Sequence, residues 1–568
     1  MATDLHEDLV RVWEAIAASA SDLPDPEYAF SEAAASIGFS LDPHQEHAAR
    51  HLEGPIRVLA PAGSGKTRTL TARISRLISG GIPADRILAL AFNTKAAEEM
   101  ADRLAELVPG KVQTRTFHSL GYGIVREIGG WRYDPDNEGR VRDLAGSVLR
   151  RHLALPAHPG ERKRLFAGAL AVLIRGKARL TPYREMAVVH GEATHQLAGS
   201  FREWVEAQKS RALLTFADMI YFAVCGLVED TDLRRRWQSR FDFILVDEFQ
   251  DLNAAQMLLV RILALPQNNL FVVGDDDQLI YAWREAEQQH ILDFERMYPG
   301  AGTVVLSTNY RSGRKIVRHG RWLIENNPER VAKDIRPSET AELGEVEIAR
   351  AGSPEDQARR AVEWVRRIKH AAGLDWSDFG LLFRINRDAE RLEQALTEAG
   401  IPFTTARSGP PEPDDSPPDA VEGQVTLMTI HKSKGKEFPY VVVFNLSRGG
   451  GASPDEADER RVAYVGVTRA GRGLLVTSGE GRPAPFLIEL ALNPNFDDYA
   501  EPFLERRLVH ARRAHLRRTG NWRGWLASHF RSAEHPLPPN DRTGASDEID
   551  LLETELRFRR ILGIEKKP

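Results

Sequence analysis

Residues 55–69, with the sequence PIRVLAPAGSGKTRT, constrain the fold more than any other stretch of the chain. The apolar residues Ile56, Val58 and Leu59 predict a short buried strand, and apolar residues at helical spacing follow the glycines. A strand, a glycine loop and a helix in this order are typical of a phosphate-binding loop. Backbone N–H groups of such a loop turn towards the phosphates, and the helix N-terminus adds partial positive charge. The stretch therefore predicts an α/β domain that binds nucleotide phosphates.

The residues expected to enclose the phosphates are Ala62, Gly63, Ser64, Gly65, Lys66 and Thr67. Lys66 would reach the outer phosphates, and the Thr67 hydroxyl would ligate Mg²⁺. Ala60 stands where the usual pattern has glycine, but it keeps the position small. A chance glycine turn is the alternative, and acidic residues further along the chain argue against it.

Those acidic residues follow an apolar strand predicted over residues 241–246. Asp247 would hold Mg²⁺, directly or through water, and Glu248 would polarise the attacking water as the general base. Adjacent carboxylates can also be a solvated strand end. The phosphate loop in the same chain favours the catalytic interpretation.

A further strand, predicted over residues 270–273, leads into the sequence GDDDQLIYAWR. Gln278, beside the hydrolysis site, could sense the terminal phosphate. Tyr281 and Trp283 could stack on nucleic-acid bases, each stack contributing about 1–3 kcal/mol, or they could be core aromatics. A single loop that contacted both ligands would couple them.

Three residues give weaker signals on their own. Phe92 and His118 follow predicted strands, at the sheet edge where ligands bind in parallel α/β folds. Each is as easily a core side chain as a contact to nucleic acid. Gln45 precedes the phosphate-loop strand, and its amide could read an adenine edge or could simply be exposed at a helix start.

Composition limits the class of protein. The 568 residues are too many for one core and predict about three or four units. With a net charge of −5 and a pI near 6.4, a nucleic-acid site must be a local basic groove. The single cysteine, Cys225, excludes an internal disulfide and is expected in the core. Without a signal-peptide pattern or a long apolar run, we expect a soluble cytoplasmic protein that contacts no membrane.

The motifs resemble, in order and spacing, those of the UvrD/Rep/PcrA-type helicases of superfamily 1. The matching segments are residues 41–45, 60–67, 90–100, 116–119, 246–251, 273–284, 309–312, 424–439 and 459–470. This resemblance implies an α/β fold with two RecA-like motor domains, which use ATP and Mg²⁺. It also implies travel from 3′ to 5′ along single-stranded DNA.

The resemblance further implies roles for individual residues. Outside the phosphate loop, those implied to contact ATP are Gln45, Arg68, Tyr310, Arg311, Glu437 and Arg469. Gln45 and Arg68 would lie near the adenine, with Tyr310 stacked on it. Arg311 and Arg469 would neutralise charge at the γ-phosphate, although each could also form a surface salt bridge. Glu437 would contact the ribose.

Single-stranded DNA would be contacted by residues from both motor domains. The residues implied to face it are Phe92, His118, Trp283 and His431, and Tyr281 is a further candidate.

The positions of the motifs predict the domain boundaries. We expect an N-terminal helical extension over residues 1–40, a first motor domain over 41–119 and 214–303, a helical insertion over 120–213, a second motor domain over 304–490, and a basic helical extension over 491–568. The insertion is arginine-rich and shows no strand alternation. Its charges could be solvated or could contact duplex DNA.

The chain departs from typical relatives at residues 408–420, a proline-rich acidic linker. Those relatives carry a large helical insertion here, the 2B subdomain, and its absence puts duplex unwinding in doubt. We expect an ATP-dependent DNA helicase or translocase of DNA repair, replication or defence, acting on single-stranded DNA and duplex junctions. The alternative is a DNA-stimulated ATPase subunit or DNA sensor that works with a partner, for example a nuclease. The C-terminal extension could bind such a partner or pack on the motor domain.

Overall fold

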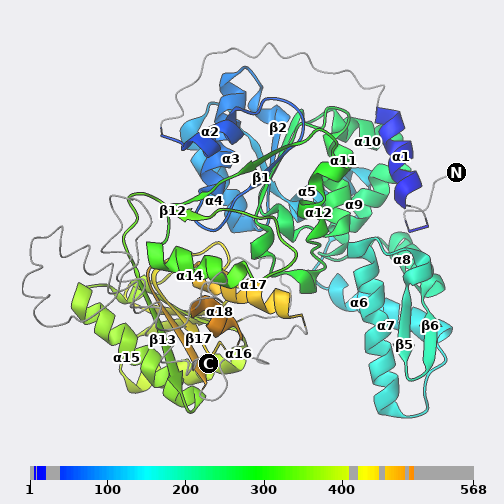
Figure 1. The fold of residues 1–568 in the computed structure, drawn as a ribbon. Helices are drawn as coiled ribbons and strands as arrows, with labels where there is room; N and C mark the ends of the chain where they lie inside the picture. The colour runs from blue at the N-terminus through cyan, green and yellow to red at the C-terminus, as the bar shows by residue number, and fades with distance from the viewer. Residues whose placement is uncertain are drawn as a thin grey trace, which may run out of the picture. The chain divides into compact units, whose positions relative to one another are not determined.

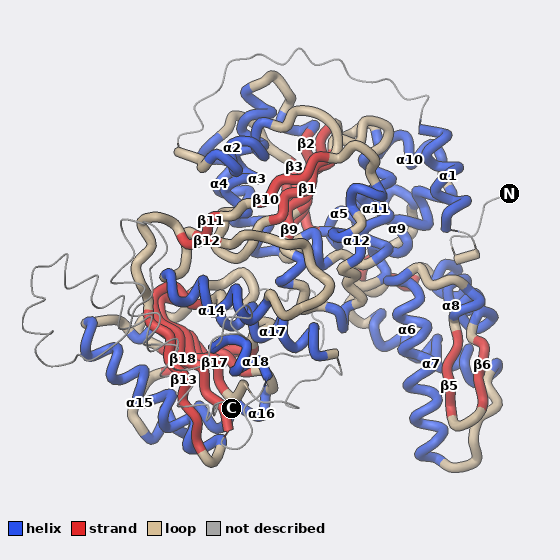
Figure 2. Tube along the Cα trace, in the orientation of Figure 1, coloured by secondary structure: helices blue, strands red, loops and turns tan. Residues whose placement is uncertain are grey.

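The computed structural model describes residues 6, 7, 9–20, 39–407, 420–446, 455–479 and 485–491. They divide into two compact units, one built mainly from residues before 307 and the other mainly from residues after it (Figure 1). Each unit contains a six-stranded parallel sheet flanked by helices, as the strands in Figure 2 show. The predicted α/β class, with two sheets of the RecA-like kind, is confirmed.

The first sheet has the strand order β10-β1-β9-β8-β2-β3. Its strands are β1 Ile56–Leu59, β2 Ile87–Ala91, β3 Gln113–Thr116, β8 Phe243–Val246, β9 Leu270–Gly274 and β10 Gly302–Val305. Val58 of β1 lies opposite Val273 of β9 and Val304 of β10. Strands β1, β2, β8 and β9 are buried along their whole length, as expected for a parallel sheet covered on both faces.

The helices of the first unit's core are α1 Leu9–Ala20, α2 Pro43–Arg50, α3 Lys66–Ser79, α4 Thr94–Leu107, α5 Phe117–Ile128, α9 Asp218–Glu229, α10 Thr231–Gln238, α11 Ala254–Ala264, α12 Gln289–Leu292 and α13 Phe294–Met297. Short 3₁₀ turns lie at η1 Ala84–Arg86, η3 Phe249–Asp251, η4 Asp276–Gln278 and η5 Ala282–Arg284. Apolar residues of α3 and α4 pack on β1 and β2 in one core cluster. Polar residues begin the helices: Asp42 caps α2, Asn93 caps α4 and Thr116 caps α5.

The insertion between α5 and α9 is mostly helical, with α6 Asn137–His152, α7 Pro159–Arg179 and α8 Ala198–Arg211, and the turn η2 Tyr183–Glu185. The prediction that it lacks strands is wrong. Strands β5 Ala187–His190 and β6 Ala193–Gln196 form an antiparallel hairpin, and β4 Arg132–Tyr133 pairs with β7 Leu213–Leu214. The hairpin turns at Gly191, which has φ +63° and precedes Glu192. A glycine in a two-residue turn is the local signal of a hairpin, but four-residue strands are too short to show alternation.

Helix α1 lies within the predicted N-terminal extension. Residues 21–38 lie outside the described part of the chain. This helix is held through side chains on α10 and α11. The Arg261 guanidinium lies 3.8 Å from the Trp13 ring centre, and Arg234 Nη2 donates to Ser19 Oγ over 3.0 Å. The N-terminal segment therefore packs on the first unit.

The second sheet has the order β13-β18-β17-β14-β16-β15. Its strands are β13 Glu345–Ala351, β14 Phe379–Phe383, β15 Phe403–Ala406, β16 Val425–Thr429, β17 Phe438–Phe444 and β18 Ala470–Gly479, and a small separate sheet holds β11 Thr308–Asn309 and β12 Arg336–Pro337. The helices are α14 Arg314–Ile324, α15 Pro354–Ala372, α16 Asn386–Glu398, α17 Glu456–Val467 and α18 Pro485–Ala491, with the turn η6 Trp376–Asp378. Helices α15 and α16 cover the face that carries Phe379, Leu381 and Phe383.

Several predictions fall on residues outside the described part of the chain. They concern the linker over 408–420, of which Ala420 alone is described, and the C-terminal extension beyond Ala491. Cys225 is buried in α9, as expected, and burial raises the pKa of its thiol to about 12. No described helix combines the length and the hydropathy that a membrane crossing requires.

Candidate nucleotide and nucleic-acid site

The phosphate loop lies between β1 and α3, as predicted. Gly63 and Gly65 have φ values of +73° and +83°, a conformation that side chains other than glycine adopt only with strain. A Cβ atom on Gly65 would lie 2.6 Å from Gln45 Nε2, so a larger residue would also displace the Gln45 amide. Gly65 is the N-cap of α3, and within the described residues no side chain caps this helix end. Its first N–H groups can therefore face a phosphate.

Gln45 is at a helix start, as one interpretation held, but it is buried, with 2% of its surface exposed. Its Oε1 accepts a hydrogen bond from the Asp42 N–H over 3.2 Å, and its amide group packs on Gly65. Arg68 is exposed one turn into α3. Its Nη2 donates to Ser40 O over 2.7 Å, and its guanidinium lies 4.7 Å from the Phe39 ring centre. Both residues predicted to lie near the adenine thus border the phosphate loop.

Lys66 and Glu248 form the ion pair at the centre of the site. Lys66 Nζ lies 3.0 Å from Glu248 Oε1, and both side chains are largely buried. Burial alone would lower the pKa of the Lys66 ammonium. The carboxylates of Glu248, Asp247 and Asp275 outweigh it and raise the pKa above the usual lysine range. The three strand-end acids therefore act on one lysine, which stays protonated at neutral pH.

The two acidic residues that follow β8 are held by different hydrogen bonds. Asp247 Oδ1 accepts a hydrogen bond from the Glu248 N–H over 2.9 Å. Glu248 has φ +50°, which is rare for a residue with a side chain. Its second carboxylate oxygen, Oε2, accepts from Gln250 Nε2 over 2.5 Å. The sequence showed Gln250 as part of the motif match but did not show this contact.

The loop after β9 reaches the same place. Gln278 is buried, and its Nε2 donates to Asp275 Oδ2 over 2.7 Å. Gln250 Oε1 accepts from the Asp275 N–H over 2.9 Å. The structure thus joins Lys66, Glu248 and Gln278, which the sequence assigned to catalysis, through Gln250 and Asp275.

The oxygen donors at this edge suit a magnesium ion, which prefers carboxylate and hydroxyl ligands. Thr67 lies in the first turn of α3, and Asp247 follows β8 with 8% of its surface exposed. Asp247 also acts electrostatically on Lys66, the next residue to Thr67. In the described part of the chain, Asp275, Asp276 and Asp277 are the acidic group whose oxygens lie within 4.8 Å of one another. Thr67 and Asp247 thus offer hydroxyl and carboxylate oxygens of the kind that Mg²⁺ prefers, whereas the acidic residues that lie together are a different set, Asp275–Asp277.

Aromatic side chains from two strand ends lie together beside this site. The rings of Phe92 and Tyr281 are stacked, with centres 5.1 Å apart and planes 16° apart. Trp283 meets Tyr281 edge to face, and the Arg284 guanidinium lies 4.7 Å from the Trp283 ring centre. Tyr281 is 9% exposed whereas Trp283 is 51% exposed. Trp283 therefore presents most of the accessible aromatic surface of this cluster.

His118 stacks on Phe216, with ring centres 3.9 Å apart, and Tyr133 meets Phe216 edge to face. Burial, and to a lesser degree the charge of Arg284, lowers the pKa of His118 to about 4, so its imidazole is neutral at pH 7. Phe216 and Tyr133 were not among the residues predicted from the sequence. The one available signal was an aromatic residue, Phe216, just before a predicted helical segment.

The second unit groups its own predicted nucleotide residues. Arg311 Nε donates to Glu437 Oε2 over 2.5 Å, and Arg311 Nη1 donates to Thr468 O over 3.3 Å. Arg469, the next residue, is buried and donates from Nη1 to Lys436 O over 3.2 Å. Tyr310 is 51% exposed. His431, predicted to face DNA, follows β16 and is half-buried.

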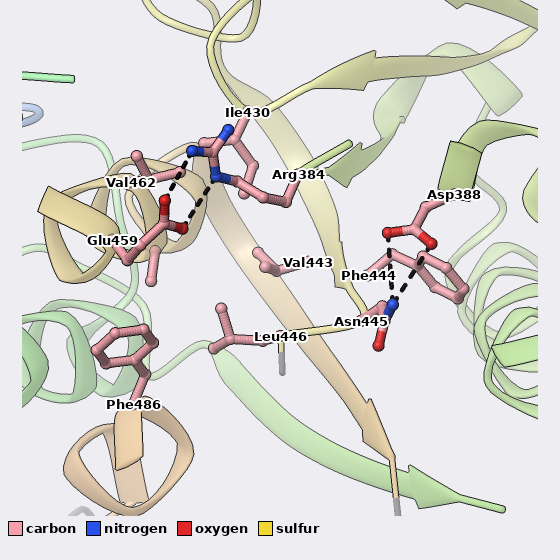
Figure 3. A pocket seen from close by; sticks show the side chains of 11 residues that line it. Arg384, Asp388, Ile430, Val443, Phe444, Asn445, Leu446, Glu459, Val462 and Phe486 are labelled. Atoms are coloured by element: carbon pink, nitrogen blue, oxygen red, sulfur yellow. Dashed lines mark hydrogen bonds and ion pairs between the residues drawn. The ribbon is translucent and has the colours of Figure 1, made fainter. Parts of the chain in front are cut away.

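A small cavity of about 30 Å³ lies near the ends of β14, β16 and β17 in the second unit (Figure 3). On one side of the cavity, Arg384 forms a bidentate ion pair with Glu459. On the other side, Asn445 donates to both carboxylate oxygens of Asp388. Burial raises the pKa of Asp388. The cavity has room for a water molecule and is far too small for a nucleotide.

Sequence comparisons agree with this geometry. Residues 41–299 match the UvrD/REP helicase N-terminal domain, and residues 304–409 and 424–477 match UvrD-like helicase C-terminal domains. These ranges contain the phosphate loop, both carboxylates and both arginines discussed above.

Individual relatives match over the same region. The putative ATP-dependent DNA helicase YjcD of Bacillus subtilis is 34% identical over 381 residues, 66% of this chain and 49% of that protein. The ATP-dependent DNA helicase PcrA of Leuconostoc citreum is 32% identical, over 63% of this chain and 49% of its own length. The helicase Rep of Salmonella typhimurium is 31% identical, over 64% and 54%. The match thus spans about half the length of these relatives. The chain belongs to the UvrD-like helicase family.

Proposed function

We propose that this protein is an ATP-dependent DNA helicase or translocase that moves 3′ to 5′ on single-stranded DNA. The observation that carries the proposal is the contact between Lys66 and Glu248 at the phosphate loop, 3.0 Å apart. It brings the phosphate-binding lysine and the general base of a nucleotide hydrolase to one point. The relatives that match are named as ATP-dependent DNA helicases.

The first unit supplies the hydrolytic chemistry. Lys66 binds the outer phosphates, and Glu248 takes a proton from the attacking water as the bond to the γ-phosphate breaks. Gln278, held on Asp275, senses the terminal phosphate. Mg²⁺ bound through Thr67 and Asp247 would neutralise phosphate charge. The loop residues Ala62, Gly63, Ser64 and Gly65 enclose the phosphates with their backbone.

The remaining contacts to ATP come from residues around the loop and from the second unit. Gln45 and Arg68 bind near the adenine, Tyr310 stacks on it and Glu437 contacts the ribose. Arg311 and Arg469 stabilise the charge that develops on the γ-phosphate. The Arg311–Glu437 pair keeps two of these residues together.

DNA bases stack on the aromatic cluster of the first unit. Trp283 offers the exposed ring, Phe92 and Tyr281 support it, and His118 and His431 contribute further contacts. Trp283 follows Gln278 by one short turn of chain, so base stacking and phosphate sensing share one loop. This sharing is the physical basis for coupling strand movement to hydrolysis.

One observation favours the second candidate, an ATPase subunit or sensor that does not unwind alone. Strands β15 and β16 are direct neighbours in the sheet, and only residues 407–424 connect them. This connection is too short for the helical subdomain expected there in typical relatives. In this second candidate, a protein partner bound through residues 491–568 would complete the activity in the cytoplasm.

The deciding experiment is ATP hydrolysis by the purified chain with and without single-stranded DNA, beside the Glu248→Gln variant. We expect DNA to stimulate hydrolysis and the variant to lose it. Tailed duplexes then separate the two candidates: unwinding of 3′-tailed but not 5′-tailed duplex supports a self-sufficient helicase. Stimulated hydrolysis without unwinding supports the subunit. Equal hydrolysis by Glu248→Gln would refute the assigned site.

A further inference from the structure

A buried amide connects the general base to the loop after β9. Gln250 has no exposed surface, and its side chain makes two hydrogen bonds in opposite directions. Nε2 donates to Glu248 Oε2 over 2.5 Å, and Oε1 accepts from the Asp275 N–H over 2.9 Å. We propose that Gln250 is a positioning residue for ATP hydrolysis, which holds the Glu248 carboxylate in its reactive orientation. This inference rests on the proposed function, because it requires Glu248 to act as the base.

This contact to Gln250 matters because substrate binding is expected to disturb another contact of Glu248, the ion pair with Lys66. Oε1 pairs with Lys66, and Lys66 is also the residue expected to bind the outer phosphates. Phosphate and Glu248 therefore compete for one ammonium group. Gln250 binds the other carboxylate oxygen, so its contact can persist when Lys66 turns to the phosphate.

The amide is oriented by its surroundings. The Asp275 N–H can only donate, so the Gln250 oxygen must face it, and the NH₂ group then points at Glu248. The amide both accepts from the N–H and donates to the carboxylate, which an aliphatic side chain of this length cannot do. Leucine would leave the buried Asp275 N–H without its partner, and glutamate would set a second carboxylate against Glu248.

The backbone of the next strand leaves room for this amide. A Cβ atom on Gly274 would lie 2.5 Å from Gln250 Oε1, so a larger residue would push the amide away. Asp275 in turn accepts from Gln278 through its carboxylate. Glu248, Gln250, Asp275 and Gln278 therefore form one hydrogen-bonded series. A movement of the loop after β9 would therefore displace the Glu248 carboxylate through Gln250.

The first test compares Gln250→Leu with Gln256→Leu in DNA-stimulated ATP hydrolysis. Gln256 is a matched control, since it is also a buried glutamine of the same unit, but it caps α11 through Asn253. Misplacing a catalytic group by about 1 Å can cost about a hundredfold in rate. We expect Gln250→Leu to lower kcat by about ten- to a hundredfold with KM for ATP changed by less than about threefold. Gln256→Leu should keep the wild-type kcat.

The second test uses Gln250→Glu, which has nearly the same shape, and varies the pH. Two adjacent carboxylates share a proton, and the pKa of the pair's second deprotonation rises. When that proton sits on Glu at position 250, its O–H donates to Glu248 as the amide did. We therefore expect the ratio of variant to wild-type kcat to increase as pH falls from about 8 to about 6. A side chain needed only for packing would not give this profile.

The outcomes separate the inference from the proposed function. A wild-type chain without DNA-stimulated hydrolysis, or a fully active Glu248→Gln variant, would overturn both. An active wild type with inactive Glu248→Gln, but with Gln250→Leu within about twofold of wild type, overturns the positioning role alone. If Gln250→Leu does not fold, as judged by circular dichroism, the pH profile of Gln250→Glu decides, and a flat ratio overturns the inference.

Discussion

Gly65 shows how a single residue sets the geometry of the phosphate loop. Its φ of +83° strains the backbone of any other residue, and a Cβ atom here would lie 2.6 Å from Gln45 Nε2, which would have to move. Gly54, a few residues earlier, has a similar φ of +79° but no atom within 4 Å of its would-be Cβ. A comparison of substitutions at the two glycines therefore distinguishes the effect of backbone strain from the effect of crowding at the phosphate loop.

We expect Gly65→Ala to weaken nucleotide binding by about five- to thirtyfold, because strain of about 1–2 kcal/mol and the clash with Gln45 displace the loop. Binding of a fluorescent ATP analogue would measure this change. Gly54→Ala carries the same kind of strain away from the loop and should bind the nucleotide like the wild type. Equal losses in the two variants would contradict the explanation.

Among the secondary-structure elements, the helical insertion and the core of the first unit are joined by a buried ion pair. Lys177 of α7 donates to Asp218 of α9 over 2.6 Å, and Gln208 of α8 donates to the other oxygen of Asp218 over 2.8 Å. The Lys177 ammonium lies 3.8 Å from the Trp204 ring centre. Burial lowers the pKa of Lys177, and the Asp218 carboxylate offsets part of this effect. Three helices thus depend on one pair of charges.

Lys177→Met should lower the free energy of unfolding by about 3–5 kcal/mol, because it leaves the Asp218 carboxylate buried without its cation. Urea unfolding of the full chain, followed by tryptophan fluorescence, would measure this loss. The double variant Lys177→Met/Asp218→Leu should recover part of it, since no charge then remains buried. A double variant less stable than Lys177→Met would contradict this account.

The hairpin β5–β6 shows why the strands of the insertion could not be predicted from the sequence. Its strands are four residues long and half-exposed, so no periodic pattern distinguishes them from the surrounding arginine-rich helices. By contrast, β1, β2, β8 and β9 are fully buried and mostly apolar, and the sequence predicts a strand at each of them. A strand that is buried along its whole length shows in the sequence as a run of mostly apolar residues. A short, half-exposed pair of strands leaves no such run.

For the molecule as a whole, the proposed function requires that a bound DNA strand influence ATP hydrolysis at the phosphate loop. Trp283 is the exposed ring of the aromatic cluster, and Gln278 lies a few residues before it on the same loop. Gln278 contacts Asp275, which also contacts Gln250. The short segment 278–283 therefore carries both the proposed contact to a DNA base and the link to the hydrolytic residues.

Trp283→Ala should raise the concentration of single-stranded DNA needed for half-maximal ATPase stimulation by about five- to a hundredfold, corresponding to one lost stack of about 1–3 kcal/mol. Hydrolysis without DNA should be unchanged, because the Trp283 ring is 51% exposed and packs on Tyr281 and Arg284. Trp283→Phe keeps an aromatic face and should recover most of the effect. An unchanged DNA requirement in Trp283→Ala would exclude this ring as a stacking site.

The sequence by itself determined the fold class, the phosphate loop and the two strand-end acids, because buried strands and glycine turns act through residues adjacent in the chain. Only the tertiary structure decided which side chains meet. It showed that Gln250 lies between Glu248 and Asp275, that Phe216 stacks on His118, and that Tyr281 is buried while Trp283 is exposed. The Gln250 contacts join the ends of β8 and β9, which are neighbours in the sheet, and the His118–Phe216 stack joins α5 to the residues just before α9. Their geometry follows from the packing of whole elements, which no local pattern of residues records.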